Sequence, residues 1–178
     1  MSYEKTLETK EIYKGKILDL DVEKVELQNG KISYREIVRH NGACAVLAVN
    51  NNKVVMIRQY RKPVDLDLLE IPAGKIDEGE LPEACAVREL EEETGFIPRK
   101  LIKLGEIYTS PGFSNEIIYM YYSNELLVGK INRDEDEFID VVEVEMESLD
   151  GMIKEGKIKD GKTLAAITMY RSLVLAND

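Results

Sequence analysis

The sequence predicts an α+β protein with a small antiparallel β segment at its amino terminus. Between Glu11 and Val38, alternating polar and apolar residues flank Asn29-Gly30, a strong short-range signal for a β-hairpin. A nearly continuous apolar run over residues 43–49 is typical of a buried strand. A helix is predicted from about Pro82 to Thr94, because proline suits the first helical turn and Gly95 the position just past the helix end.

The amino-terminal segment is expected to depend on other parts of the structure. Residues 1–10 show no regular pattern and are expected to be frayed, whereas residues 11–38 have a β pattern. About 40 residues are too few to bury a core alone. We therefore predict an amino-terminal β subdomain over residues 1–42, covered by the main domain or by a second copy of the chain. A main domain follows over residues 43–178.

The rest of the chain alternates strands and helices. After a turn at residues 50–52, strands are predicted over residues 54–59, 66–71, 101–109, 117–127 and 138–144. Helices are predicted over residues 148–155, with Ser148 as the cap, and over residues 163–175. On the last helix, five apolar residues are expected to face the core: Ala165, Ala166, Met169, Leu173 and Val174.

Three carboxylates fall on one face of the helix over residues 82–94. Glu89, Glu92 and Glu93 are three or four positions apart, so their side chains are neighbours. Like charges at this spacing repel unless a cation joins them, and carboxylate oxygens suit Mg²⁺ or Mn²⁺. Arg88 is four residues before Glu92 and can pair with it. A solvated acidic face is the alternative interpretation. The opposite side is expected to dock on the core through Ala84, Val87 and Leu90.

The segment from Gly74 to Phe96 reads GKIDEGELPEACAVRELEEETGF. It matches the Nudix box, G-x5-E-x7-R-E-U-x-E-E-x-G-U with U a bulky apolar residue, at every defined position. The chain therefore resembles the Nudix hydrolases. The resemblance implies the Nudix fold, a mixed β-sheet between helices. It also implies a Mg²⁺-dependent enzyme that cleaves a diphosphate linked to another moiety.

The resemblance also suggests roles for individual residues. The implied metal ligands are Glu89, Glu93 and the backbone carbonyl of Ala73, with Glu92 close by as a further catalytic carboxylate. The general base in several Nudix groups lies in a later acidic loop, here residues 133–137. The candidates are Glu135 and Glu137, and a solvated charged turn is the alternative. Structural roles are implied for four residues of the box: Gly74, Glu80, Arg88 and Gly95.

Features outside the box resemble the ADP-ribose pyrophosphatase group. These are Pro111, which lies 16 residues after Gly95, the RQYR run at residues 58–61, and the amino-terminal β segment. The resemblance implies hydrolysis of ADP-ribose to AMP and ribose 5-phosphate by a homodimer that exchanges its amino-terminal segments. The implied substrate contacts are Arg35, Arg58, Arg61 and Pro111. The chain has no tryptophan, so a tyrosine or phenylalanine would have to stack on adenine.

Two other functions remain open. The first is the same chemistry on another nucleoside diphosphate sugar or on an oxidised nucleotide. The second is a Nudix-fold sensor that binds a nucleotide without turnover. The intact box argues against the sensor, because a sensor needs neither a base nor a metal cluster.

Composition excludes several other classes. The net charge of −10 argues against non-specific nucleic-acid binding, which needs basic clusters. The first ten residues are too polar for a signal peptide, and no apolar run is long enough to span a bilayer. We therefore expect no membrane contact and a cytoplasmic location. Cys44 and Cys85 lack metal-ligand spacing and are expected to be buried thiols. His40 is the only histidine, which gives little support to histidine-based nucleophilic catalysis.

Overall fold

A computed structural model describes residues 3–133 and 137–174. The chain forms two compact units. The first contains the residues up to Gly42 together with residues 108–117, and the second contains the rest. Residues 108–117 were not expected in the first unit. They belong to it because Val38 donates a backbone hydrogen bond to Phe113 (2.8 Å) and accepts one from Asn115 (3.2 Å).

The first unit is a three-stranded antiparallel sheet in the order β1-β2-β3. Its strands are β1 (Lys5–Lys14), β2 (Asp19–Glu26) and β3 (Ile32–Arg39). The predicted hairpin is confirmed, with a five-residue connection between Glu26 and Ile32. The expected fraying of residues 1–10 is wrong for the described part, because Lys5 to Lys10 pair with β2. The charged side chains of β1 hide the alternation by which a strand is recognised.

The amino-terminal sheet buries very little of itself. All ten residues of β1 are exposed, and Val25 is the one fully buried residue among the three strands. Several large apolar side chains on the sheet are more than two fifths exposed: Leu7, Ile12, Tyr13, Ile32 and Tyr34. Such a sheet has too little core to be stable alone.

The second unit is built on a seven-stranded sheet. Strands β4 and β10 are parallel. Strand β4 is antiparallel to β5 and β7, and β5 is antiparallel to β6 and β12. Its path is β12-β5-β4-β10-β9, with β6 paired to β5 and β7 paired to β4. The strands are β4 (Ala43–Asn50), β5 (Lys53–Arg61), β6 (Leu66–Glu70), β7 (Ala73–Lys75), β9 (Ile102–Tyr108), β10 (Ile117–Ser123) and β12 (Ile139–Glu145). A small separate sheet pairs β8 (Phe96–Pro98) with β11 (Leu126–Val128).

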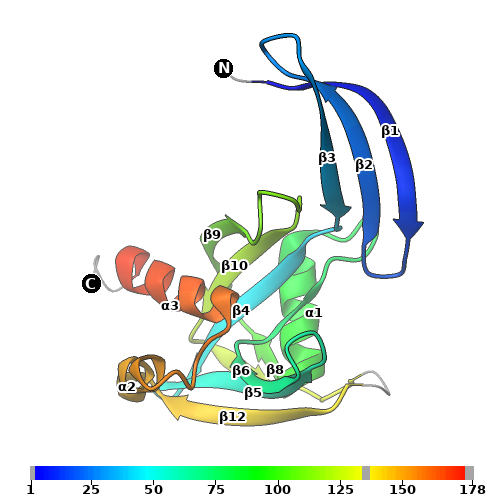
Figure 1. The fold of residues 1–178 in the computed structure, drawn as a ribbon. Coiled ribbons are helices and arrows are strands. Elements are labelled where there is room, and N and C mark those ends of the chain that lie inside the picture. The colour runs from blue at the N-terminus through cyan, green and yellow to red at the C-terminus, as the bar shows by residue number, and fades with distance from the viewer. Residues whose placement is uncertain (1–2, 134–136, 175–178) are drawn as a thin grey trace. The chain divides into compact units, whose positions relative to one another are not determined.

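Helices cover both faces of this sheet, as Figure 1 shows. The residues of β4 alternate between two cores. Ala45 and Leu47 pack with α3 (Gly161–Leu173) and α2 (Leu149–Lys154), whereas Cys44 and Val46 pack with α1 (Pro82–Thr94). A strand buried on both faces reads as a continuous apolar run, which is why it was recognised in the sequence. The predicted α+β class and the mixed sheet between helices are confirmed.

Several details of the helices differ from expectation. On α1, Cys85 and Ala86 dock on the core and Ala84 is exposed. Ser148 makes no capping hydrogen bond, and a 3₁₀ turn (Met146–Ser148) precedes α2. Helix α3 begins two residues earlier than expected, because the side chain of Asp160 caps it by accepting from the Thr163 N–H. Leu173 on this helix is exposed. No described helix is both long and apolar enough to cross a membrane.

Candidate active site

Arg88 organises the loop and helix of the box. Its Nε and Nη2 each donate to a different oxygen of Glu80 at 2.9 Å. Its Nη1 donates to Glu89 at 2.7 Å and to Glu92 at 3.0 Å. Glu80 in turn accepts from the backbone N–H of Asp77. One guanidinium therefore ties the loop before α1 to two carboxylates on the helix.

Gly74 leaves space for the carboxylate of Glu89. A Cβ atom added at Gly74 would lie 1.9 Å from Cδ of Glu89, so only a residue without a side chain allows this close approach. Gly74 is held in β7, opposite Cys44 of β4. Gly95 ends α1 in the left-handed conformation with φ of 76° and donates to the carbonyl of Glu91. These two glycines therefore have structural roles: Gly74 admits the Glu89 carboxylate, and Gly95 ends the helix.

Glu93 is the most unusual carboxylate of the site. Its residue is only 2% exposed, and its Oε2 accepts from the backbone N–H of Ala73 at 3.0 Å. Burial raises its pKa to about 8, against this hydrogen bond, and the charges of Glu89 and Glu137 raise it further. Burial also raises the pKa of Glu89, although Arg88 opposes that shift. Both carboxylates are thus held where water does not stabilise their negative charge.

Such a donor set fits a divalent cation. A bound cation would offset the desolvation and mutual repulsion that raise the pKa of Glu89 and Glu93, and carboxylate and carbonyl oxygens suit Mg²⁺ or Mn²⁺. The candidate ligands are Glu89, Glu93 and the carbonyl of Ala73, with Glu92 beside them. Within residues 3–133 and 137–174, no three His, Cys, Asp or Glu side chains are already gathered into a metal-binding group. Arg88 and the Ala73 N–H hold the carboxylates instead.

The acidic loop is fastened to the end of α1. Arg133 donates to the carbonyl of Glu93 through Nε and Nη2 and to the carbonyl of Ile139 through Nη1. The backbone N–H of Asn132 donates to the carbonyl of Glu92. These contacts bring Glu137 close enough for its charge to act on Glu89 and Glu93. Glu135 lies outside the described residues. The anchoring role of Arg133 was not predicted, because its partners are backbone groups.

Arg61 belongs to an ionic cluster around the buried carboxylate of Glu70. Its Nε and Nη2 donate to the two oxygens of Glu70 at 2.8 Å each, and Glu70 is 1% exposed. Lys162 contacts the same carboxylate and pairs with Asp160 at 3.2 Å. The charge of Arg61 also acts on Glu93. The cluster was missed, because Glu70 and Lys162 are 92 residues apart in sequence. The Asp160 cap is the one local signal that could have drawn attention to it.

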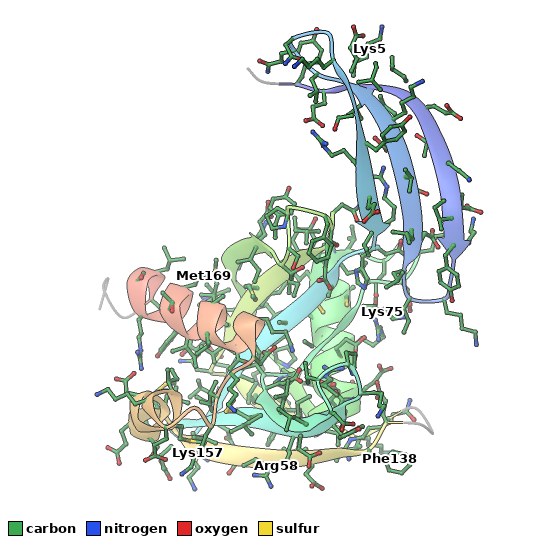
Figure 2. The ribbon with its side chains drawn as sticks, viewed as in Figure 1. Lys5, Arg58, Lys75, Phe138, Lys157 and Met169 are labelled. Atoms are coloured by element: carbon green, nitrogen blue, oxygen red, sulfur yellow. The ribbon has the colours of Figure 1, made fainter. Side chains whose placement is uncertain are left out.

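The other predicted substrate residues are divided between the two units. Arg35 lies on β3 of the first unit, where its guanidinium binds Glu4, the Ser33 hydroxyl and the Tyr34 carbonyl. Pro111 is exposed in the loop of the same unit. Arg58 is exposed on β5, opposite Asp140 of β12. Figure 2 labels Arg58 and Phe138 along β12, the strand that pairs with β5.

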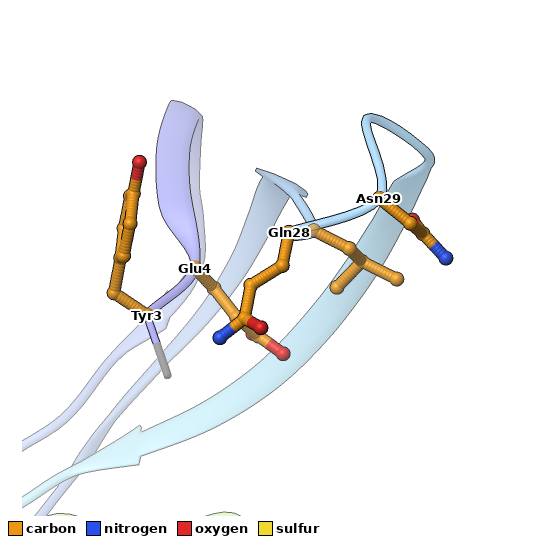
Figure 3. Close-up of a pocket in the computed structure, with 5 residues that line it drawn as sticks. Tyr3, Glu4, Gln28 and Asn29 are labelled. Carbon is orange, nitrogen blue, oxygen red and sulfur yellow. The ribbon is translucent and has the colours of Figure 1, made fainter. Parts of the chain in front are cut away.

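Two further features include none of the carboxylates of α1. Cys44 and Cys85 are buried free thiols, as expected, with their sulfur atoms 2.8 Å apart. A shallow pocket at the tip of the amino-terminal sheet is lined by Tyr3, Glu4, Leu27, Gln28 and Asn29 (Figure 3). No residue of the box lines that pocket, so we do not assign it to the reaction.

The pairing of Glu80 with Arg88 predicts a pH-dependent contribution to stability. The Arg88 hydrogen bonds lower the pKa of Glu80 to about 2. A carboxyl with a lowered pKa stabilises the fold above its ordinary pKa, and this contribution is lost as pH falls towards 2. Glu80→Gln is therefore expected to lower the free energy of unfolding by about 1 kcal/mol at pH 7. Urea unfolding should show that the difference declines to about half or less by pH 3.

Glu78→Gln is the matched control, because Glu78 is exposed in the same loop. It should leave the free energy of unfolding unchanged at both pH values. A Glu80→Gln difference that stays constant from pH 7 to pH 3 would contradict the assigned origin of the stabilisation.

Comparison with known proteins agrees with this geometry. A model of the NUDIX domain matches residues 38–167, and a model of the nucleoside diphosphate sugar hydrolase N-terminal domain matches residues 4–38. The chain is 50% identical to an ADP-ribose pyrophosphatase from Bacillus subtilis (strain 168) over 167 residues, which span 92% of this chain and 90% of that protein. It is 47% identical to a methanol dehydrogenase activator from Bacillus methanolicus over the same length and with the same coverage.

A solved structure shares the fold. The structure of an ADP compounds hydrolase superposes with a TM-score of 0.88 and covers 98% of this chain and 95% of that one, at 19% identity. The match of the NUDIX domain model extends over most of the chain and includes the whole box. The chain therefore belongs to the Nudix hydrolase family.

Proposed function

We propose that this protein is a Mg²⁺-dependent pyrophosphatase that hydrolyses the diphosphate bond of ADP-ribose to AMP and ribose 5-phosphate. The observation that carries the proposal is the face of α1 on which Glu89 and the buried Glu93 meet the Ala73–Gly74 backbone, with Glu92 held beside Glu89 by Arg88. The substrate is suggested by the relative at 50% identity that is named an ADP-ribose pyrophosphatase.

Each part of the site has a task in this reaction. Glu89, Glu93 and the Ala73 carbonyl would hold the metal, which when bound neutralises phosphoryl oxygens and lowers the pKa of water. Arg88 keeps Glu89 and Glu92 in place. Glu137 is the described candidate for the general base, because its charge reaches Glu89 and Glu93. It would take a proton from the attacking water, and Glu135 is the second candidate.

A substrate panel tests the proposal. Purified protein is incubated with Mg²⁺ and, in separate reactions, with ADP-ribose, GDP-mannose, other sugar nucleotides and an oxidised nucleoside triphosphate. The highest kcat/KM is expected with ADP-ribose, with AMP and ribose 5-phosphate as products. A higher kcat/KM for another nucleoside diphosphate sugar would identify that compound as the preferred substrate. Binding without turnover of any of these compounds would make the protein a sensor instead.

The buried free thiols support the cytoplasm as the working compartment, because disulfides are rare where thiols are kept reduced.

The bare amino-terminal sheet supports a homodimer. Its exposed apolar side chains, among them Leu7, Ile12 and Tyr34, need a cover that the sheet itself does not supply. In the proposed dimer, each amino-terminal unit is covered by the other subunit, and Arg35 of one chain reaches substrate held near Glu89 of the other. Two-fold dimers are the commonest homo-oligomers of soluble proteins.

Subunit mixing tests the shared site. Inactive Arg35→Ala protein is mixed with inactive Glu93→Gln protein, and the subunits are allowed to exchange. Each heterodimer then regains one fully wild-type site, so activity should recover towards a quarter of the wild-type value under statistical exchange. Exchange is verified separately with tagged subunits. If exchange occurs without recovery, Arg35 serves its own subunit. A monomer in sedimentation at micromolar concentration would exclude the dimer.

A further inference from the structure

The first turn of α3 is attached to the segment that leads into the box. The Thr163 hydroxyl accepts from the backbone N–H of Ile71 at 2.9 Å. Lys162 binds the carboxylate of Glu70. Both contacts are buried, since Thr163 is 0% and Glu70 1% exposed. Only Pro72 separates Ile71 from Ala73, whose N–H binds Glu93. Helix α3, far away in sequence, thus fixes the backbone on which the candidate metal site is built.

Glu70 holds the guanidinium of Arg61 in one orientation. The two oxygens of Glu70 accept from Nε and Nη2 of Arg61. Three of the five arginine N–H groups remain, two on Nη1 and one on Nη2. No other hydrogen bond of this guanidinium occurs among the described residues. A planar fork held on one edge presents the remaining donors in a fixed direction, which suits phosphate oxygens.

Lys162 makes the net charge of the cluster around Arg61 less negative. A lone Arg61–Glu70 pair would carry no net charge, and Asp160 adds a negative charge beside it. The ammonium of Lys162, only 11% exposed, lies between Glu70 and Asp160 and contacts both. Removing it would leave two carboxylates against one guanidinium, next to the carboxylates of α1. A diphosphate would then meet a more negative surface.

We propose that Lys162 is a positioning residue for substrate binding, which acts through Glu70 to keep Arg61 oriented and its positive charge available to the diphosphate. This inference rests on the proposed function, because it assumes an anionic diphosphate substrate near Arg61. We assign Lys162 no contact with substrate, because its ammonium lies between two carboxylates and is only 11% exposed. It should therefore affect binding of substrate more than the chemical step.

The test uses purified full-length variants with ADP-ribose and Mg²⁺. Lys162→Met is expected to raise KM about tenfold or more, with kcat changed less than about threefold. Lys162→Arg restores the charge and should return KM most of the way. Lys159→Met removes the same charge from an exposed position of the same segment and should leave KM unchanged. Lys162→Gln is measured in parallel, and thermal unfolding verifies that each variant is folded, so the test survives if one variant does not fold.

A double-mutant cycle separates positioning from a structural role. In the Arg61→Ala background, Lys162→Met should change KM by less than about threefold, against about tenfold or more in the wild type, because the orientation of Arg61 no longer matters and only the nearby charge is lost. Equal effects of Lys162→Met in both backgrounds would overturn the proposal, and so would a KM like that of Lys159→Met. A wild-type protein that hydrolyses none of the diphosphate sugars would instead overturn the proposed function, which is a distinguishable result.

Discussion

Glu93→Gln is expected to lower kcat by about 10²-fold or more, on the scale of removing a group that stabilises charge in the transition state. The substitution preserves size and removes one proposed metal-binding charge. The fold should tolerate it, because the amide oxygen can still accept from the Ala73 N–H and a buried charge is lost. Steady-state kinetics at saturating Mg²⁺ measures the activity, and thermal unfolding measures the stability without metal.

Metal binding gives this prediction a second readout. A cation that binds only the folded state raises the unfolding temperature, so Mg²⁺ should stabilise the wild-type protein and have much less effect on Glu93→Gln. Glu83→Gln is the control, since Glu83 lies exposed on the first turn of the same helix. Near-wild-type turnover of Glu93→Gln at saturating Mg²⁺ would remove Glu93 from the metal site.

The helix and its carboxylates could be predicted because their signals are local. Pro82 and Gly95 bound α1 as the sequence indicates, and the spacing of Glu89, Glu92 and Glu93 depends only on helical geometry. The burial of Glu93 was not predictable in the same way. It arises because β7 brings the Ala73 N–H against the helix, a contact between segments 20 residues apart.

The missed features depend on contacts across the sequence. Strand β1 shows no alternation because it lies exposed on both faces at the edge of a sheet, where charged residues are tolerated. Glu70 sits in an apolar run, and its charge is stabilised by Arg61 and Lys162. Neither partner is recognisable before the fold is known. Lys162 and Glu70 are 92 residues apart, so the Asp160 cap beside Lys162 is the only local signal near this pair.

The second large effect is expected in the acidic loop. Glu137→Gln or Glu135→Gln should lower kcat by about 10²-fold or more with little change in KM, the pattern of a lost proton acceptor. Glu137 is the candidate of the two that the structure describes, and its charge acts on both Glu89 and Glu93. Single-turnover kinetics with ADP-ribose would show whether the slow step in the variant is the chemical step.

Asp140→Asn provides the matched control for Glu137→Gln. Asp140 lies three residues further on, exposed on β12, so its loss removes a similar charge from the same region without reaching the carboxylates of α1. Arg133, which binds the carbonyls of Glu93 and Ile139, should keep the loop attached in all three variants. A general base is expected to be needed only for the proton transfer, so Mg²⁺ should still stabilise Glu137→Gln against heat. Full activity of both glutamine variants would place the base elsewhere, and Glu92, which is one-third exposed beside Arg88, would then be the residue to replace.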